Sequence, residues 1–231
     1  MLNPKLRVVV NRIKDRSLRE KVADFLDNPT IKIGNTRYSG LPLDRSPASI
    51  SRHHNYSGGL LEHILASSQV ALDLCAVVRK VYCGNVDSDL VLCGTILHDL
   101  FKPLTYVEKA DGGYKTSPLA EKIDHLTLIV SELIRRGFPM SVIHIVCAHH
   151  GYEAGPVGPH TVEALVCHLA DLADSKLNGD VLSAARYLTK EATGEELGRV
   201  SSKEAFEIVY RKAIEGWEGV RRTIEEIRAR Y

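Results

Sequence analysis

Histidines and aspartates lie within or at the ends of apolar, helix-forming stretches of this chain, and this feature constrains its fold more than any other. The residues concerned are His63, His98, Asp99, His125, His149, His150 and Asp171. Buried metal ligands must converge from several directions, and imidazole nitrogens and carboxylates on separate rigid helices meet that need for a divalent transition metal. The sequence therefore predicts a helical fold that gathers these side chains around a metal centre.

The spacing of apolar residues is helical over most of the chain, and strand-like alternation is scarce. We predict an all-α protein with helices near residues 4–14, from 17 onward, and over 60–82, 87–100, 118–137, 141–150, 161–178, 180–192 and 202–229. Ser17 and Glu20 form a capping-box pattern, and Gly179 is expected to end the helix before it. Residues 30–40 favour a short β-hairpin, and ADGGYKTS (110–117) favours a polar turn or a tiny hairpin.

The domain organisation is expected to be simple. The chain has 231 residues and shows no internal repeat or low-complexity linker, and a single large domain can have this length. We expect residues 1–45 to form a small N-terminal elaboration that packs on a main helical domain of residues 46–231.

The charge balance gives the chain no broad attraction to polyanions. A formal net charge of +1 supplies no general drive toward nucleic acid or anionic lipid, although a local basic patch is not excluded. The N-terminus lacks the apolar stretch of a secretory signal, and no run approaches the roughly 20 apolar residues of a membrane span. The five cysteines form no C-x-x-C pair, which favours a reducing, cytoplasmic location.

His98 and Asp99 end the almost wholly apolar helical stretch VLCGTILHD. An ionised aspartate is costly to bury unless a positive group compensates its charge. Neighbouring residues of a helix project about 100° apart, so both side chains can still reach one ion beside the helix. The alternative is an aspartate that faces water next to a buried structural histidine.

The other histidines have comparable settings. His63 follows GGLLE and opens an apolar stretch, although such a histidine is often a core or capping residue. His125, in KIDHLTLIVSELI, is expected to face inward near the start of a helix. His149 and His150 end SVIHIVCAHHG, where Gly151 lets the chain turn away. A doublet points in two directions, so one ring can bind metal while the other meets substrate or a supporting group.

In HLADLADSK, the residues His168, Asp171 and Asp174 recur every third position and so share one helix face. Carboxylates between leucines indicate a site, and the alternative is the polar face of an amphipathic helix. His53 and His54 stand in the loop before GGLLEH, where they either close over a site or form a surface pair. The motifs G-x-G-x-x-G, G-x-x-x-x-G-K-[ST], H-E-x-x-H and G-x-S-x-G are absent.

Four blocks in this order carry a resemblance to a known family: SPASISRHHNYSGGLLEHIL, GTILHDLFKP, AHHG and EALVCHLADLADSK. Together they span about residues 46–178 and resemble the HD-domain superfamily of metal-dependent phosphohydrolases. They look like the HD domain of bacterial 3′-5′ exoribonucleases of the YhaM type, and like stand-alone archaeal HD phosphodiesterases of the dihydroneopterin cyclic-phosphate type. The resemblance implies an HD-type helical bundle.

The resemblance also implies roles for individual residues. His63, His98, Asp99 and Asp171 match the ligands of one divalent metal ion, and Asp99 would bridge to a second ion held by His125 and His149. Mixed histidine and aspartate ligands suit Mn²⁺, Fe²⁺, Co²⁺, Ni²⁺ or Zn²⁺, and either one or two ions are expected.

Lys102, in HDLFK, matches the family lysine that can meet a phosphate. Leu100 and Phe101 replace the small residue and glycine that are usual before this lysine, which changes the pocket beside it. We expect Lys102 and one of His53, His54 or His150 to hold the phosphate or protonate the leaving oxygen.

The predicted function is that of a phosphodiesterase acting on a small nucleotide- or pterin-like molecule through metal-activated water. The first 45 residues are too short and too helical to supply the RNA-binding OB-fold of the exoribonucleases. A 3′-5′ exonuclease on RNA or single-stranded DNA is the second interpretation. The third is a non-catalytic protein that binds nucleotide in an HD pocket, against which the full ligand set argues.

Overall fold

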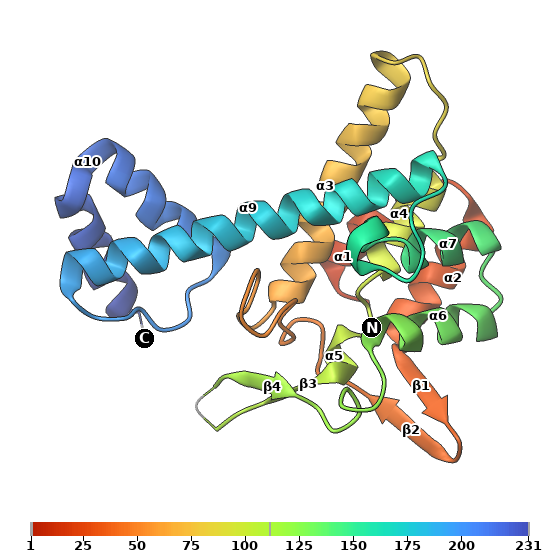
Figure 1. Cartoon of the computed structure of the whole chain (residues 1–231), viewed down its shortest axis with the longest axis horizontal. Coiled ribbons are helices and arrows are strands. Elements are labelled where there is room, and N and C mark those ends of the chain that lie inside the picture. The colour runs from red at the N-terminus through yellow and green to blue at the C-terminus, as the bar shows by residue number, and fades with distance from the viewer. Residues whose placement is uncertain (1, 111, 231) are drawn as a thin grey trace.

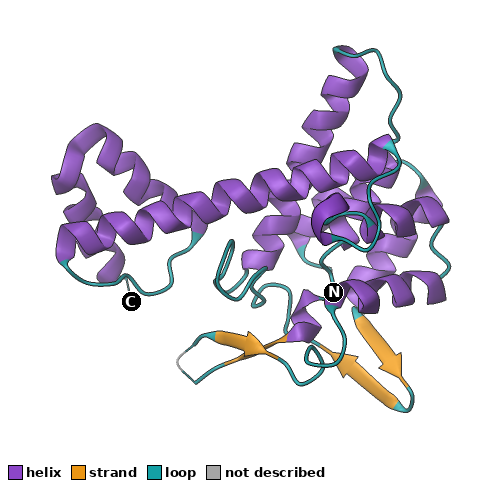
Figure 2. Cartoon of the chain, viewed as in Figure 1, coloured by secondary structure: helices purple, strands orange, loops and turns teal. Residues whose placement is uncertain are grey.

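The computed structural model describes residues 2–110 and 112–230. Helices dominate, and two short hairpins lie along one side of the body (Figure 2), which confirms the predicted all-α class with a small hairpin near 30–40. The helices are α1 (Pro4–Val10), α2 (Arg16–Asp27), α3 (Gly59–Lys80), α4 (Ser88–Leu97), α5 (Lys102–Thr105), α6 (His125–Arg135), α7 (Met140–Cys147), α8 (Gly151–Ala154), α9 (Val162–Thr193) and α10 (Ser202–Arg228). The strands are β1 (Thr30–Ile33), β2 (Thr36–Ser39), β3 (Tyr106–Glu108) and β4 (Tyr114–Thr116).

Both hairpins are antiparallel. β1 pairs with β2, with Ile33 opposite Thr36, and Gly34 adopts the positive φ of 57° that a tight connection requires. β3 pairs with β4, with Tyr106 opposite Thr116. The second hairpin therefore begins earlier than ADGGYKTS, and Asp111 within that stretch lies outside the described residues.

α4 forms the centre of the body, and every residue from Val91 to Leu100 is buried. It packs against α3, α7 and α9. Gly94 permits the contact with α7, because a Cβ atom at this position would lie 2.2 Å from Cγ2 of Ile145. This close packing holds the C-terminal ends of α4 and α7 near each other, and these are the ends that precede the two predicted histidine motifs.

The N-terminal helices share the core of the body. Leu6 and Phe25 are fully buried in one apolar cluster with Leu60 and Ile96. The ring of Phe25 meets Phe101 edge-on, with centroids 5.4 Å apart. The N-terminal segment is thus tied to the residues that follow His98-Asp99, while the boundary at residue 45 stays a prediction.

Helix α2 begins at a different cap from the one predicted. Its N-cap is Asp15, whose carboxylate accepts a hydrogen bond from the Leu18 amide at 2.8 Å. The predicted capping box of Ser17 and Glu20 is therefore wrong. Aspartate is as good an N-cap as serine, and its negative charge is also favoured by the helix dipole.

Helix α6 begins later than the predicted start after Ser117. Residues 117–123 form turns, in which the Ser117 hydroxyl accepts a hydrogen bond from the Ala120 amide at 3.2 Å. The helix starts at His125, after the N-cap Asp124, whose side chain accepts from the Thr127 amide. This late start makes His125 the first residue of the helix.

α9 is a 32-residue helix that crosses from the body to a projecting region, which we name the C-terminal arm (residues 180–230; Figure 1). The predicted end at Gly179 is wrong, because the helix continues to Gly194, which has a φ of 73°. Leu182 and Ala185 are buried against α10, and this packing outweighs the cost of about 1 kcal/mol for a glycine inside a helix. α10 itself is kinked at Gly216.

By length and composition α3 is apolar enough to cross a membrane, contrary to the prediction that no run approaches the length of a membrane span. We interpret it as a core helix because it packs on α4 and α9 and buries His63, Ile64 and Ala71.

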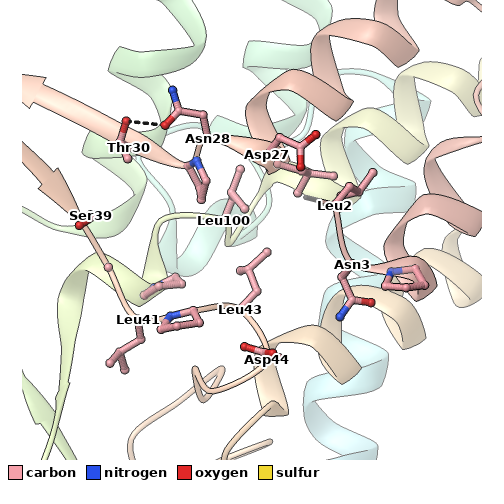
Figure 3. A pocket seen from close by; sticks show the side chains of 16 residues that line it. Leu2, Asn3, Asp27, Asn28, Thr30, Ser39, Leu41, Leu43, Asp44 and Leu100 are labelled. Carbon is pink, nitrogen blue, oxygen red and sulfur yellow. Dashed lines mark hydrogen bonds between the residues drawn. The ribbon is translucent and has the colours of Figure 1, made fainter.

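A cavity of about 600 Å³ lies between the N-terminal segment and the loop after β2 (Figure 3). Leu2 and Asn3 lie on one side of it, Leu43 and Asp44 on another, and Leu100 contributes to its wall. None of the predicted site residues is among the side chains that line it. The predicted site residues therefore lie outside this cavity.

Candidate metal centre

The predicted ligands converge on one buried centre. They come from α3, from the turns after α4 and α7, from the first residue of α6 and from the middle of α9: His63, His98 and Asp99, His149 and His150, His125, and Asp171. Groups among them place potential ligand atoms within 4.8 Å of one another. The helices thus bring the predicted ligand residues together at one place in the fold.

One group of side chains surrounds His63. Its Nε2 atom lies 3.1 Å from Nε2 of His98, 3.4 Å from Oδ2 of Asp99 and 3.2 Å from Oδ1 of Asp171. His98 Nε2 in turn lies 3.4 Å from Oδ2 of Asp99 and 3.8 Å from Oδ1 of Asp171. Two ring nitrogens and two carboxylates therefore face a common point, and we name His63, His98, Asp99 and Asp171 the first ligand group.

A second group meets the opposite oxygen of the same aspartate. Oδ1 of Asp99 lies 3.3 Å from Nε2 of His125 and 3.8 Å from Nε2 of His149. His150 belongs to this side as well, since its ring centroid is 5.5 Å from that of His125. We name Asp99, His125, His149 and His150 the second ligand group. Asp99 belongs to both groups, with one oxygen directed to each.

Backbone carbonyls fix the orientation of two of these rings. The Nδ1–H of His98 donates to the Thr95 carbonyl at 2.7 Å, and that of His149 donates to the Val146 carbonyl at 2.6 Å. Each bond leaves the Nε2 lone pair directed at the centre, which is how proteins commonly orient a metal-binding histidine. Both acceptors lie three residues earlier in the chain, so helix ends are well suited to build this arrangement.

Asp174 plays the same supporting part for His63. Its Oδ2 atom accepts from Nδ1 of His63 at 2.7 Å and from Nε2 of His54 at 2.9 Å. Because Asp174 follows Asp171 by three residues on α9, both carboxylates reach His63 from one helix face. The spacing of Asp171 and Asp174 in the sequence indicates the shared face, but it does not reveal the contact of Asp174 with His63.

The two neighbouring histidines of the 46–57 loop, His53 and His54, have different surroundings. His54 is buried, with a φ of 42°, and its Nδ1 atom lies 2.8 Å from the Tyr56 hydroxyl while Nε2 contacts Asp174. Both ring nitrogens are thus engaged within the protein, which disfavours the predicted contact of His54 with substrate. His53 is nearer the open side, with its ring centroid 5.3 Å from that of His63, and burial lowers its pKa to about 3, with a smaller contribution from the Lys102 charge.

The two ligand groups of the centre lie in different electrostatic environments. Burial alone lowers the pKa of His63, but the carboxylates of Asp171, Asp174 and Asp99 outweigh it and hold that pKa well above its usual value. Around His149 burial prevails, and the charge of His98 adds to it, so the His149 pKa lies well below its usual value. The first group is therefore rich in negative charge, and the second is poor in it.

Lys102 lies at the centre, next to Asp99. Its Nζ atom lies 2.5 Å from Oδ2 of Asp99. Burial opposes the charge on Asp99, yet Lys102 and His98 hold the pKa of its carboxyl well below the usual value. The aspartate is ionised, and the ammonium group next to it can also contact a bound phosphate.

Metal ions fit these residues. Asp99 Oδ1, His125 Nε2 and His149 Nε2 are buried and, within the described residues, have no hydrogen-bond partner. Burying such groups without a partner costs roughly 1–3 kcal/mol each, and a cation between them would satisfy all three. The donor set of imidazoles and carboxylates is that of Mn²⁺, Fe²⁺, Co²⁺, Ni²⁺ or Zn²⁺ sites.

The remaining histidines of this region have structural contacts. His144 Nε2 accepts from the His160 amide at 3.1 Å. His168 Nδ1 donates to the carbonyl of His149 at 2.7 Å, and Gly151, with a φ of 74°, leaves room for the His168 ring, which a Cβ atom would approach to 2.6 Å. The turn after the histidine doublet is thus fixed from α9.

Known proteins are similar to this chain over most of its length. The HD domain family model matches residues 60–206. The chain is 40% identical over 201 residues to the dihydroneopterin 2′,3′-cyclic phosphate phosphodiesterase of Methanocaldococcus jannaschii, covering 87% of this chain and 78% of that protein. It is 29% identical over 170 residues to the 3′-5′ exoribonuclease YhaM of Bacillus subtilis, covering 68% of this chain and 50% of that protein. No solved structure matches it.

Proposed function

This chain belongs to the HD-domain family of metal-dependent phosphohydrolases, and we propose that it is a phosphodiesterase that opens a 2′,3′-cyclic phosphate on a small molecule. The observation that carries the proposal is Asp99, a buried carboxylate with one oxygen toward each group of histidines. Such an arrangement suits a pair of ions on either side of a phosphoryl group.

We assign the first ion to His63, His98, Asp99 and Asp171, and the second to Asp99, His125 and His149, with His150 within reach of the second. Divalent ions at these places would lower the pKa of bound water and neutralise charge on phosphoryl oxygens. The ligand chemistry leaves Mn²⁺, Fe²⁺, Co²⁺, Ni²⁺ and Zn²⁺ as candidates.

Protein groups at the rim have distinct tasks in this proposal. Lys102 keeps its positive charge, because the carboxylate of Asp99 outweighs burial and raises the lysine pKa, so it can bind a phosphoryl oxygen. His53 and His150 have pKa values lowered by burial. Their rings are therefore neutral near pH 7, and each can donate one N–H to the phosphate or to the leaving oxygen without adding a charge.

A cyclic phosphate of a small molecule is the proposed substrate for two reasons. The relative that is 40% identical acts on dihydroneopterin 2′,3′-cyclic phosphate, and its similarity extends through nearly all of this chain. The net charge of +1 provides no general attraction to a polynucleotide.

The test is hydrolysis by purified protein, stripped of metal and then reloaded with each of the five candidate ions. We expect dihydroneopterin 2′,3′-cyclic phosphate to be opened to a monoester, with Asp99→Asn as the inactive control. Failure to open any cyclic phosphate with any of these ions would contradict the proposal.

The similarity to an exoribonuclease makes a 3′-5′ exonuclease the second candidate. It predicts stepwise shortening of a 5′-labelled RNA or single-stranded DNA by the Mn²⁺-loaded protein. An intact oligonucleotide, under conditions in which a cyclic phosphate is opened, would remove this candidate.

A further inference from the structure

A groove of about 620 Å³ leads away from the second ligand group, between α6 and the segment that begins with α8. His125 and His150 line its inner end, so the groove is continuous with the proposed metal centre. Its volume lies within the range of about 300–1,000 Å³ that is usual for small-molecule pockets.

The groove wall is largely apolar. Its apolar surface comes from Leu126, Val130, Ile134, Cys147, Ala154 and Pro156. Two of its polar side chains are already hydrogen-bonded within α6: the Ser131 hydroxyl donates to the Leu128 carbonyl at 2.8 Å, and the Asp124 carboxylate accepts from the Thr127 amide and hydroxyl at 2.8 and 2.7 Å. An apolar occupant therefore leaves none of these groups unpaired.

The charges of the groove disfavour a phosphate. No lysine or arginine occurs among the described residues that line it, and Asp124 brings a carboxylate. Burial raises the pKa of this carboxyl, but its hydrogen bonds with Thr127 outweigh burial and lower it below the usual value. An anion would be repelled by this carboxylate and would find no cation to pair with. The groove and the metal centre are thus chemically opposite, and a ligand that spans both must have an anionic end and a neutral end.

We infer that this groove binds the neutral, flat, heteroaromatic ring of a small phosphoester substrate while the phosphate lies at the metal centre. The inference rests on the proposed function and specifies its substrate class. The ring enters between α6 and Pro156, and His125 and His150 stand at the junction between ring and phosphate.

The experiment compares two cyclic phosphates on the metal-loaded protein. Guanosine 2′,3′-cyclic phosphate carries a neutral bicyclic ring, and glycerol 1,2-cyclic phosphate carries none. The substitution Ser131→Trp places an indole in the groove at an exposed helix position. We expect it to lower the ratio of kcat/KM for the ring-bearing over the ring-free substrate by about tenfold or more, mainly through KM, because the indole takes the volume of the ring.

Ser183→Trp, at an exposed position of α9 in the C-terminal arm, is the matched control and should leave the ratio unchanged within about twofold. Ile134→Glu, at a side chain that is 60% exposed, adds charge without bulk and is the second test if circular dichroism shows that Ser131→Trp misfolds. Fluorescence titration with neopterin, which has a ring and no phosphate, should show binding to the parent protein and weaker binding to either groove variant.

The outcomes separate the two proposals. If the parent protein opens both cyclic phosphates and the groove variants keep the parent ratio, the inference is overturned and the proposed function stands. If the parent protein, loaded with each of the five candidate ions, opens no cyclic phosphate, dihydroneopterin 2′,3′-cyclic phosphate included, the proposed function fails, and the inference fails with it.

Discussion

The two ligand groups of the candidate metal centre share Asp99 but differ in the number of carboxylates around their histidines. Around His63 the carboxylates of Asp99 and Asp171 lie within 3.4 Å and that of Asp174 at 2.7 Å. Around His125 and His149 the described contacts include one carboxylate, Asp99. Charge, and not only ligand count, therefore distinguishes the two groups: two carboxylates of the first group would neutralise a divalent ion, whereas the second group would leave an ion net positive.

This contrast has a functional meaning. An ion that keeps more of its positive charge attracts the anionic substrate more strongly, and the groove that we assign to the substrate ring opens beside the second group. We therefore expect the first group to retain its ion tightly and the second group to exchange its ion more easily.

The largest effect is expected at the residue that both groups share. Asp99→Asn removes the negative charge between the histidines and should lower kcat by on the order of 10³-fold or more. Elemental analysis should show loss of metal from both groups, because neither retains its common ligand. A variant that kept a full metal content would contradict the bridging role of Asp99.

Removing one ligand from each group should reveal the asymmetry. Asp171→Asn affects the first group and His125→Gln the second, and each should reduce the bound metal to about half of the parent content if two ions are present. After dialysis against a weak chelator, the parent protein should lose the second ion first, so that its content approaches that of His125→Gln. Equal loss from both groups would show that the charge difference does not control retention.

A smaller effect is expected at Asp174, which contacts His63 and no other predicted ligand of the described centre. Asp174→Asn keeps the shape but weakens the orientation and basicity of His63, and such supporting groups typically contribute 10–100-fold in metal affinity. The change should appear as a larger dissociation constant for the first ion, while the dissociation constant of the second ion stays the same. Asp180→Asn, an exposed aspartate of the same helix paired with Lys176, is the control and should not alter either affinity.

Much of this comparison was predictable from sequence, because helix ends and helix faces are local. The His98-Asp99 pair at the end of an apolar run, the Gly151 turn after the doublet and the shared face of Asp171 and Asp174 follow from residue spacing. The partners of Asp174 were not predictable, since His63 and His54 lie 111 and 120 positions away. The crossing of α3 and α9 brings His63 to Asp174, and the loop before α3 brings His54 there.

Loop histidines and helix ends were the weaker points, for physical reasons. His54 was expected at the substrate, but its left-handed backbone turns the ring inward to Asp174, and no local pattern encodes that. The passage of α9 through Gly179 depends on burial of Leu182 and Ala185 by α10. Tertiary packing of this kind overrides a local stop signal.

The smallest predicted effect is the opposite pH dependence of stability in the metal-free protein. The carboxylates around His98, against the effect of burial, raise its pKa from 6.5 to about 9, so its stabilising contribution is complete below pH 6.5 and is lost as pH rises through about 9. His149 has a pKa well below 6.5, chiefly because of burial. The unfolded chain therefore binds a proton here more readily than the folded chain, and stability falls as pH drops below 6.5.

Substitution by glutamine should expose these opposite signs. Relative to the parent, His98→Gln should unfold at a lower temperature at pH 6 than at pH 9.5, because only at pH 6 does the parent gain from the charged ring. His149→Gln should compare more favourably with the parent at pH 5 than at pH 8, because the parent alone has a buried histidine to protonate. Differences of about 2–4 °C in Tm are expected for each 1 kcal/mol in a chain of this size, measured calorimetrically in chelator. If both variants shifted in the same direction with pH, the two ligand groups would share one electrostatic environment, and the division of work between them would not hold.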